Sequence, residues 1–325
     1  MKFSCEKNLL VSAISVASRT VAMKSAIPAL EGIYIRAGVK VMLSGYNLET
    51  GITVGVDAEI RETGEAIFPS RLFFDIVRKL PDDTVEVSVD ENFKVSIRGG
   101  ISSFSITAMS AEDYPELPDV ESEKGVVLPQ KQLKEMISGT IFAVSENQAR
   151  PIHTGCLFEV ADDGITVIAV DGYRLALRRW TPEGGVGRQM KFVAPAAALK
   201  EVEKILTDSD DDCTFYLGTK HILFTIGEAT LVCRILEGEF LDWRRVLPEN
   251  NPIKLAANVS AITDSIERVS LVISEKLKSP VRCTFGDQTA DFHTVSTIGT
   301  AHDVCQIAGD GKDLEIGFNC RYLLD

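Results

Sequence analysis

The sequence predicts an α+β fold made of a repeated unit, on three observations. First, an extended apolar run followed by an amphipathic helix recurs, most clearly in KFVAPAAALKEVEKIL at 191–206 and again in AIFPSRLFFDIVRKL at 66–80 and VVLPQKQLKEMI at 126–137. Weaker copies open the chain and follow Pro252, and a last start lies at 314–325. Second, strand pairs with polar tips come after the helices. Third, the units start roughly 60 residues apart, a fixed period that is typical of repeat architectures and indicates six half-domains.

The helix of each copy should bury one face. In the clearest copy we expect it to begin at Pro195, because the missing proline N–H would be unpaired at a first helical position. Pro69 and Pro129 hold the same place in their copies. Apolar residues at helical spacing make one stripe, while Lys and Glu residues occupy the other side. The stripe residues are Leu199, Val202, Ile205 and Leu206 in this copy, Leu10, Ile14 and Ala17 in the first, and Val259, Ile262, Ile266 and Val269 after Pro252.

The strands between the helices are also repeated. PALEG at 28–32 corresponds to PIHTG at 151–155, and GYNL at 45–48 corresponds to GYRL at 172–175, at an offset of about 125 residues. Two further segments alternate apolar and polar residues around a polar tip, which predicts hairpins. These segments are VEVSVDENFKVSIRG at 85–99 and CTFYLGTKHILFTIG at 213–227.

Two passages rich in Glu, Asp and Pro suit exposed connectors between compact units: AEDYPELP at 111–118 and EGEFLDWRRVLP at 237–248. They predict three domains, at residues 1–122, 123–250 and 251–325. The third copy keeps its helix and the strand VRCTFG, but it stops inside what should be the sixth helix. We therefore expect its last half-repeat to be missing, roughly 45 residues by comparison with the other copies.

The composition is that of an ordinary globular chain, with 325 residues, 45% hydrophobic residues and a formal net charge of −13. No apolar run is long enough to span a bilayer, and MKFSCEKNLL lacks the apolar core of a secretion signal. We therefore expect a cytoplasmic protein. The acidic balance disfavours a protein that coats nucleic acid by bulk attraction, but it allows one that meets DNA on a single local face.

No residue pattern predicts catalysis, a metal or a cofactor. The chain lacks a Walker loop, a dinucleotide fingerprint and a G-x-S-x-G elbow. GGVG at 184–187 is interpreted as a polar loop, and the acidic run at 208–212 as a solvated turn rather than a cation site. The histidines lack ligand spacing: His153, His221, His293 and His302. The cysteines show no C-x-x-C pair and are expected to be buried thiols: Cys5, Cys156, Cys213, Cys233, Cys283, Cys305 and Cys320.

Ordered segments along the whole chain resemble those of one known family. They are the opening MKF, FPSRLFFDIVRKLP at 68–81, residues 99–109, RPIHTG at 150–155, VDGYRLA at 170–176, DWRRVLP at 242–248, EIGFN at 315–319 and YLLD at 322–325. In these segments the chain resembles the bacterial DNA polymerase III beta subunit, the sliding clamp family. Matches in order across three domains are more specific than any single motif.

The resemblance implies a fold of three clamp domains, each of two β-α-β-β half-repeats, with helices lining a central hole and antiparallel sheets outside. Two chains would join head to tail as a homodimer ring around duplex DNA. Such a ring is a non-catalytic accessory subunit of the polymerase III holoenzyme. It tethers the replicative polymerase for processive synthesis, and it recruits polymerases, the clamp loader, repair polymerases and mismatch-repair proteins through a pocket for short peptides. No cofactor is implied.

Candidate DNA-binding residues come partly from the resemblance. Lys24 and Asn147 match family positions on the channel side, and four cations occupy the polar side of repeat helices: Arg71, Arg78, Lys200 and Lys204. A sliding ring needs few contacts, directed at phosphates and indifferent to sequence. The alternative is that these residues are ordinary solvated charges.

The resemblance places the contact between protomers at Phe104 and Ile106 of the first domain and at Leu271 and Val272 of the third. Pairing with another chain would cover an edge strand that is otherwise open. Alternatively, Phe104 and Ile106 simply face their own core.

The resemblance also implies which residues form the peptide pocket: Val170, Gly172, Tyr173, Arg174 and Leu175 on one wall, Leu241, Arg245 and Val246 on the other, and His153 beside them. Apolar side chains with one or two cations suit a partner tail that carries Leu or Phe. The chain departs from the family at two of these positions, because Leu241 replaces the usual proline and His153 an aliphatic residue. The family's C-terminal residues, which complete the pocket, should be lacking here.

Two other classes of function remain open on the residues alone. A β-rich enzyme with a site between its domains would need titratable groups with shifted pKa values in a pocket. A lone structural repeat protein would have open ends and be monomeric. The clamp interpretation requires a closed oligomer without turnover.

Overall fold

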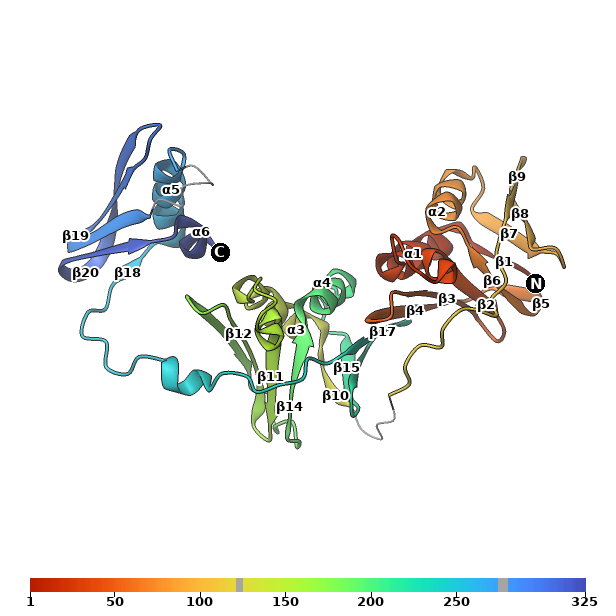
Figure 1. Ribbon diagram of the computed structural model, residues 1–325, viewed down its shortest axis with the longest axis horizontal. Helices are drawn as coiled ribbons and strands as arrows, with labels where there is room; N and C mark the ends of the chain where they lie inside the picture. The colour runs from red at the N-terminus through yellow and green to blue at the C-terminus, as the bar shows by residue number, and fades with distance from the viewer. Residues whose placement is uncertain (121–124, 274–279) are drawn as a thin grey trace. The chain divides into compact units, whose positions relative to one another are not determined.

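The computed structural model describes residues 1–120, 125–273 and 280–325 (Figure 1). The chain forms two compact units, Met1–Phe240 and Leu241–Asp325. The predicted α+β class is confirmed, because every helix stands among antiparallel strands. The first unit contains the first predicted domain and the second as far as Phe240, and the expected boundary near residue 122 lies outside the described residues.

The first half of the first unit contains two copies of the strand-and-helix repeat. Its elements are β1 (Lys2–Glu6), α1 (Lys7–Ala17), β2 (Ile33–Ala37), β3 (Val41–Tyr46), β4 (Thr50–Val56), β5 (Glu59–Glu62), β6 (Gly64–Phe68), α2 (Ser70–Lys79), β7 (Thr84–Val89), β8 (Lys94–Gly99) and β9 (Ser102–Thr107). The predicted hairpin at 85–99 is confirmed as the antiparallel pair of β7 and β8.

The second half repeats this order. Its elements are β10 (Val126–Pro129), α3 (Gln130–Ser138), β11 (Gly155–Ala161), β12 (Gly164–Val170), β13 (Leu175–Trp180), β14 (Met190–Pro195), α4 (Ala196–Ile205), β15 (Asp212–Leu217), β16 (His221–Ile226) and β17 (Ala229–Arg234). The predicted hairpin at 213–227 is confirmed as β15 and β16. The GGVG loop lies between β13 and β14, where Gly184, Gly185 and Gly187 adopt positive φ.

The second unit, described by itself, contains two α-helices, one at each predicted repeat start, and a long hairpin. Its elements are β18 (Ala256–Ala257), α5 (Val259–Ser270), β19 (Val281–Val295), β20 (Thr300–Phe318) and α6 (Cys320–Leu324). Strand order in its sheet is β18-β20-β19. Ile266 and Val269 of α5 pack with Phe292 in a core of its own.

Among its described residues, the first unit has three sheets. Their orders are β5-β1-β7-β8-β9, β13-β12-β11-β14 and the eight-stranded β10-β15-β16-β17-β4-β3-β2-β6. The eight-stranded sheet joins the two halves, because β17 pairs antiparallel with β4 and Leu231 lies opposite Ile52. Both side chains are buried. One core therefore continues from the first half into the second.

The predicted apolar stripes face this core. Leu199, Val202 and Leu206 are buried, and Ile205 packs against the core from its edge. Leu10, Ile14 and Ala17 of α1 are buried in the same way. The prediction was wrong for Val259, which was expected to be buried with the rest of its stripe but is 78% exposed. It is the first residue of α5, whose buried residues all lie in the second half of the helix.

The three prolines do not start their helices, contrary to the sequence prediction. Pro69, Pro129 and Pro195 are cap residues with extended backbone, and each helix begins one residue later. Pro129 and Pro195 are also the last residues of β10 and β14. The extended strand conformation therefore runs through the proline, which accepts it at its fixed φ.

The passage at 111–118 is also less exposed than expected. It forms neither helix nor strand, but Tyr114 stacks on Tyr34 with ring centroids 4.9 Å apart. The Tyr114 hydroxyl donates a hydrogen bond to the Ser44 carbonyl at 3.3 Å. Burial raises the pKa of Tyr114. This connector is docked against the first half of the unit rather than solvated along its length.

The cysteines are free thiols, and all but Cys320 are buried. Burial raises the pKa of Cys156 and of Cys233 to about 12. A neutral thiol suits an apolar core because charging it there would cost desolvation energy.

We expect the β17–β4 junction to be sensitive to truncation. Replacing Leu231 by Ala should lower the free energy of unfolding by about 2 to 5 kcal/mol, because the side chain is buried against Ile52 and its loss leaves a cavity. The control is Val39→Ala, at a fully exposed position, with a change within about 0.5 kcal/mol. Urea titration measures both, and equal midpoints would contradict the assignment.

The thiols give a prediction that depends on pH. At neutral pH a thiol reagent should label Cys320 in the native protein and reach Cys156 and Cys233 only after unfolding. Because folding raises both pKa values from 9.0 to about 12, the folded state binds these protons more tightly. Their contribution to stability is complete below pH 9 and is lost as pH rises towards 12. Rapid native labelling of either residue would show that the core opens easily.

Candidate functional site

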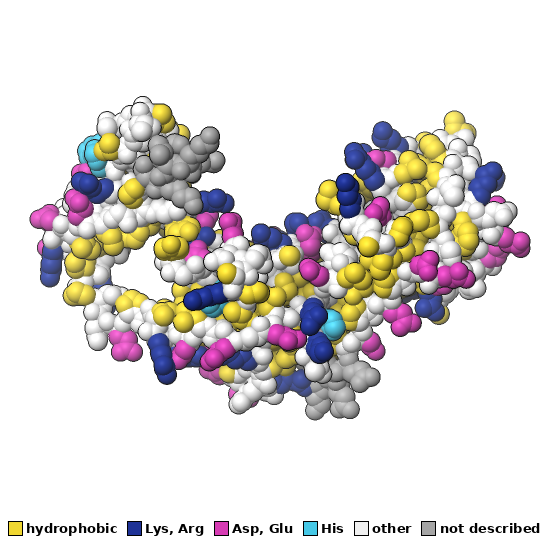
Figure 2. All heavy atoms as spheres, viewed as in Figure 1, with side chains coloured by type: hydrophobic (Ala, Val, Ile, Leu, Met, Phe, Trp, Pro, Cys, Tyr) yellow, Lys and Arg dark blue, Asp and Glu magenta, His cyan; other side chains and the backbone are white. Residues whose placement is uncertain are grey.

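Helices α1 to α4 gather on one side of the first unit, where α1 packs beside α2 and α3 beside α4 (Figure 1). Figure 2 shows Lys and Arg side chains along this side. Arg71 and Arg78 are exposed on α2, and Lys200 and Lys204 on α4. The buried stripe turns the apolar face of each helix to the core, so these cations are left on the outer face.

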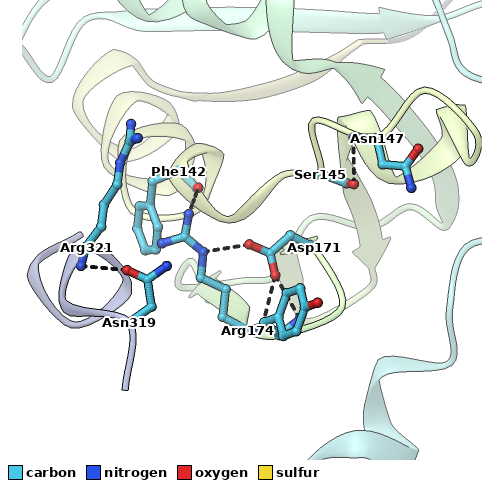
Figure 3. Close-up of polar contacts among 8 residues, drawn as sticks. Phe142, Ser145, Asn147, Asp171, Arg174, Asn319 and Arg321 are labelled. Carbon is cyan, nitrogen blue, oxygen red and sulfur yellow. Dashed lines mark hydrogen bonds and ion pairs between the residues drawn. The ribbon is translucent and has the colours of Figure 1, made fainter. Parts of the chain in front are cut away.

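Two of the candidate residues lie in loops. Lys24 is exposed between two short 3₁₀ turns, Ser18–Thr20 and Pro28–Glu31. Asn147 is exposed after the turn Ile141–Ala143, and its backbone N–H donates to the Ser145 hydroxyl at 3.1 Å (Figure 3). The Asn147 side-chain carbonyl accepts from the Ala149 N–H at 2.9 Å, so this amide helps to hold its own loop.

The candidate cations differ in how far neighbouring carboxylates neutralise them. The Lys204 ammonium lies 2.7 Å from Glu201, and the Arg78 guanidinium 3.4 Å from Asp75. Within the ranges that the structure describes, Lys24, Arg71 and Lys200 make no ion pair. The unpaired cations are the better placed to attract phosphate.

Sequence reasoning missed one cation on this side. Arg19, in the turn after α1, lies 3.5 Å from the second carboxylate oxygen of Glu201 on α4. The two residues are 182 positions apart. A basic residue directly after a repeat helix was the available signal, but nothing local pointed to its partner.

The GYRL segment at 172–175 forms a tight turn between β12 and β13 that Asp171 organises (Figure 3). The Asp171 carboxylate accepts the backbone N–H groups of Tyr173 and Arg174 at 2.9 and 3.1 Å. Gly172 has φ +93°, a conformation that favours glycine. The turn leaves the Tyr173 side chain 86% exposed.

Arg174 is held by the protein itself. Its Nε donates to Asp171 at 2.9 Å, and its Nη2 donates to the Phe142 carbonyl. The guanidinium also lies over the Phe142 ring, 5.4 Å from its centroid. Arg174 therefore fixes the turn against the segment at 141–143, besides carrying a positive charge.

The remaining residues of the first unit that are expected in the peptide pocket lie at or near the ends of its strands. Val170 is buried at the end of β12, and Leu175 is half-buried at the start of β13. His153 meets Phe240 edge-on, with ring centroids 5.2 Å apart. Burial, together with the charge of Arg150, lowers the pKa of His153.

The residues expected on the other wall belong to the second unit. Leu241 and Val246 expose apolar side chains on and beside the 3₁₀ turn Trp243–Val246. Arg245 pairs with Asp242 at 3.0 Å. In the same unit the Asn319 side chain caps α6 by accepting the Arg321 N–H at 3.1 Å (Figure 3).

The expected interface residues are partly exposed, each within its own unit. Strand β9 is the outermost strand of the five-stranded sheet, and Phe104 and Ile106 lie opposite Ile97 and Val95 of β8. Ile106 packs against the core, whereas Phe104 is 40% exposed. In the second unit Leu271, at the end of α5, is 80% exposed and Val272 is half-buried.

Among the described residues, no three His, Cys, Asp or Glu side chains gather where they could hold a metal ion. None of their helices combines the length and apolarity needed to cross a membrane.

Comparison with known proteins matches the chain in three consecutive segments. Residues 1–118 match the N-terminal domain of the DNA polymerase III beta subunit, residues 127–242 its central domain and residues 244–325 its C-terminal domain. The beta sliding clamp of Staphylococcus epidermidis is 31% identical over 341 residues, which cover 100% of this chain and 89% of that protein.

Solved structures agree. The DNA polymerase sliding clamp of Bacillus subtilis superposes with a TM-score of 0.93 at 28% identity, over 100% of this chain and 88% of that one. A sliding clamp of Pseudomonas aeruginosa bound to griselimycin gives a TM-score of 0.93 at 26% identity, over 100% and 89%. The expected clamp fold is thereby confirmed, and the chain belongs to the DNA polymerase III beta subunit family, the beta sliding clamps.

Proposed function

We propose that this chain is a sliding clamp whose two copies close head to tail into a ring around duplex DNA. It acts in the cytoplasm as a non-catalytic subunit that tethers the replicative polymerase for processive synthesis. Its domains span residues 1–122, 123–250 and 251–325. Besides family membership, the observation that carries the proposal is the first unit's layout, in which one sheet continues through two repeats and their helices expose cations on one side.

DNA is held by this helix side. Exposed cations on α2 and α4 attract phosphates without reading bases, which suits a ring that must move along any sequence. Lys24 and Asn147 add contacts from loops. The chain's net charge of −13 keeps other surfaces from adhering to DNA.

Reversing the unpaired cations tests the DNA face. We expect Lys24→Glu with Arg71→Glu and Lys200→Glu to shorten the salt-sensitive retention of loaded protein on circular DNA, since attraction becomes repulsion. The control reverses the exposed cations Arg36, Lys94 and Lys220 on strands or a hairpin tip, with the same change in charge. Retention measured across a salt series should fall only in the first variant. Unchanged retention there would refute the assignment.

The ring closes where β9 of one protomer meets the third domain of the next. An outermost strand offers unpaired backbone groups, and the exposed Phe104 ring beside it adds apolar area. Leu271 supplies an exposed apolar side chain on the opposing surface. Ile106 contributes less area, because it already packs against its own core.

The interface predicts a monomeric variant. Phe104→Glu combined with Leu271→Glu should give folded monomers, because both side chains are exposed in the protomer and both surfaces would then bury unpaired carboxylates on association. Light scattering gives the mass, and circular dichroism shows that the fold survives. Val39→Glu with Val295→Glu, at two other exposed apolar positions, serves as the control and should remain dimeric. A dimer of the first variant would place the contact elsewhere.

The peptide pocket recruits the polymerase catalytic subunit, the clamp loader, repair polymerases and mismatch-repair proteins. In the first unit the Asp171 turn presents Tyr173 to solvent beside the half-buried Leu175. The resemblance to the family is what places Leu241, Arg245 and Val246 on the other wall. Such a surface offers apolar anchoring area with few charges, as a short peptide carrying Leu or Phe requires.

A peptide titration tests the pocket. A pentapeptide of the Gln-Leu-x-Leu-Phe type should bind with micromolar affinity, near −8 kcal/mol. Val246→Glu should cost about 2 kcal/mol or more, as for a central anchor. Arg174→Ala should weaken binding by about tenfold by releasing the turn. Arg179→Ala, an exposed arginine further along β13, is the control and should bind like the parent. Equal calorimetric affinities in all variants would mean that partners dock elsewhere.

A further inference from the structure

One carboxylate on the helix side holds two cations at once. Glu201 of α4 places one oxygen 3.5 Å from the Arg19 guanidinium and the other 2.7 Å from the Lys204 ammonium. Arg19 follows α1 in the first half of the unit, so the cluster bridges both repeats. The Glu201 side chain is 20% exposed and that of Arg19 30%, whereas that of Lys204 is 52% exposed.

The neighbouring charges on α4 are arranged differently. Lys200, one residue before Glu201, makes no ion pair with any described residue. Glu203 carries the same charge as Glu201, and it likewise has no ion pair among the residues described. Of the two glutamates on this helix, only Glu201 thus neutralises cations, and the cations it neutralises are on the proposed DNA face.

We propose that Glu201 limits the clamp's grip on DNA by competing with phosphate for Arg19 and Lys204. The inference rests on the proposed function, in which this side of the unit faces DNA. It adds Arg19 to the proposed DNA face. It also gives an acidic residue the role of limiting how tightly that face binds DNA. Glu201 is a positioning residue, because it acts through the two cations rather than by touching DNA.

The physical reason is a balance of charge. Each cation that neutralises a phosphate releases counterions and steepens the salt dependence of binding. A ring already held by topology gains little from tight binding, and strong contacts would slow its movement. Because the Glu201 and Arg19 side chains are partly buried, at 20% and 30% exposed, their attraction is screened somewhat less than that of a fully exposed pair. Phosphate must therefore displace a carboxylate before it can use either cation.

The alternative is that Glu201 only fastens the first repeat to the second. Its contact with Arg19 would then contribute to stability and have no effect on DNA. The two explanations predict opposite changes in DNA binding when the carboxylate is removed, since a loosened junction cannot tighten binding.

The decisive comparison is Glu201→Gln against Glu203→Gln in the full chain. Both variants add one unit to the net charge, so bulk attraction changes equally. Binding of a labelled duplex is measured by fluorescence anisotropy between roughly 50 and 200 mM salt, where each freed cation should deepen the fall in affinity about three- to fourfold. We expect Glu201→Gln to bind more tightly at low salt, with a steeper salt slope by about 1 to 2. Equal behaviour of the two variants, or weaker binding by Glu201→Gln, would overturn the proposal.

Two further variants separate the possible failures. In a background of Arg19→Gln with Lys204→Gln, Glu201→Gln should tighten binding no more than Glu203→Gln does, and a larger gain would also overturn the proposal. Lys200→Gln tests the helix face itself, independently of Glu201. If it leaves binding unchanged, the proposed DNA face is wrong. If it weakens binding while Glu201→Gln matches Glu203→Gln, the DNA face stands and only the inference about Glu201 fails.

Discussion

Strands β17 and β4 pair antiparallel, from Ala229 opposite Val54 to Cys233 opposite Thr50, and this ladder puts two sequence repeats in one sheet. The Gly55 N–H extends it by donating to the Glu228 carbonyl at 3.0 Å. Without the pairing each repeat would end in an open edge strand. With it, the helices of both repeats are held on a common side, and the candidate DNA face follows from that arrangement.

The pairing of β17 with β4 also decides which charged side chains come into contact. Because α1 and α4 belong to different repeats, Arg19 can reach Glu201 only after the sheet has brought the repeats together. The cations of this face therefore form two classes, those already held by a carboxylate and those left open to phosphate. A surface on which only some cations are free to attract phosphate suits a protein that must stay on DNA and still move along it. Each additional free cation would increase the electrostatic affinity for DNA.

In the GYRL turn at 172–175, charge has a different effect: it holds the turn in its own conformation. Asp171 satisfies two backbone N–H groups and the guanidinium of Arg174, so the turn is preorganised before any peptide arrives. Preorganisation lowers the entropy that binding would otherwise cost. Arg174 is therefore part of the framework of the turn, whereas the Tyr173 side chain is 86% exposed.

The sequence by itself determined the repeat, the helix stripes and the hairpins, because these depend on the local periodicity of apolar residues, as Leu199, Val202 and Leu206 show. The resemblance located Lys24, Asn147 and the GYRL turn. Only the tertiary structure decided that Val259 is exposed, that Tyr114 docks on Tyr34, and that Glu201 binds Arg19. Burial and ion pairing between residues far apart in the chain depend on how elements pack, and a local pattern carries no information about which surface a side chain will meet.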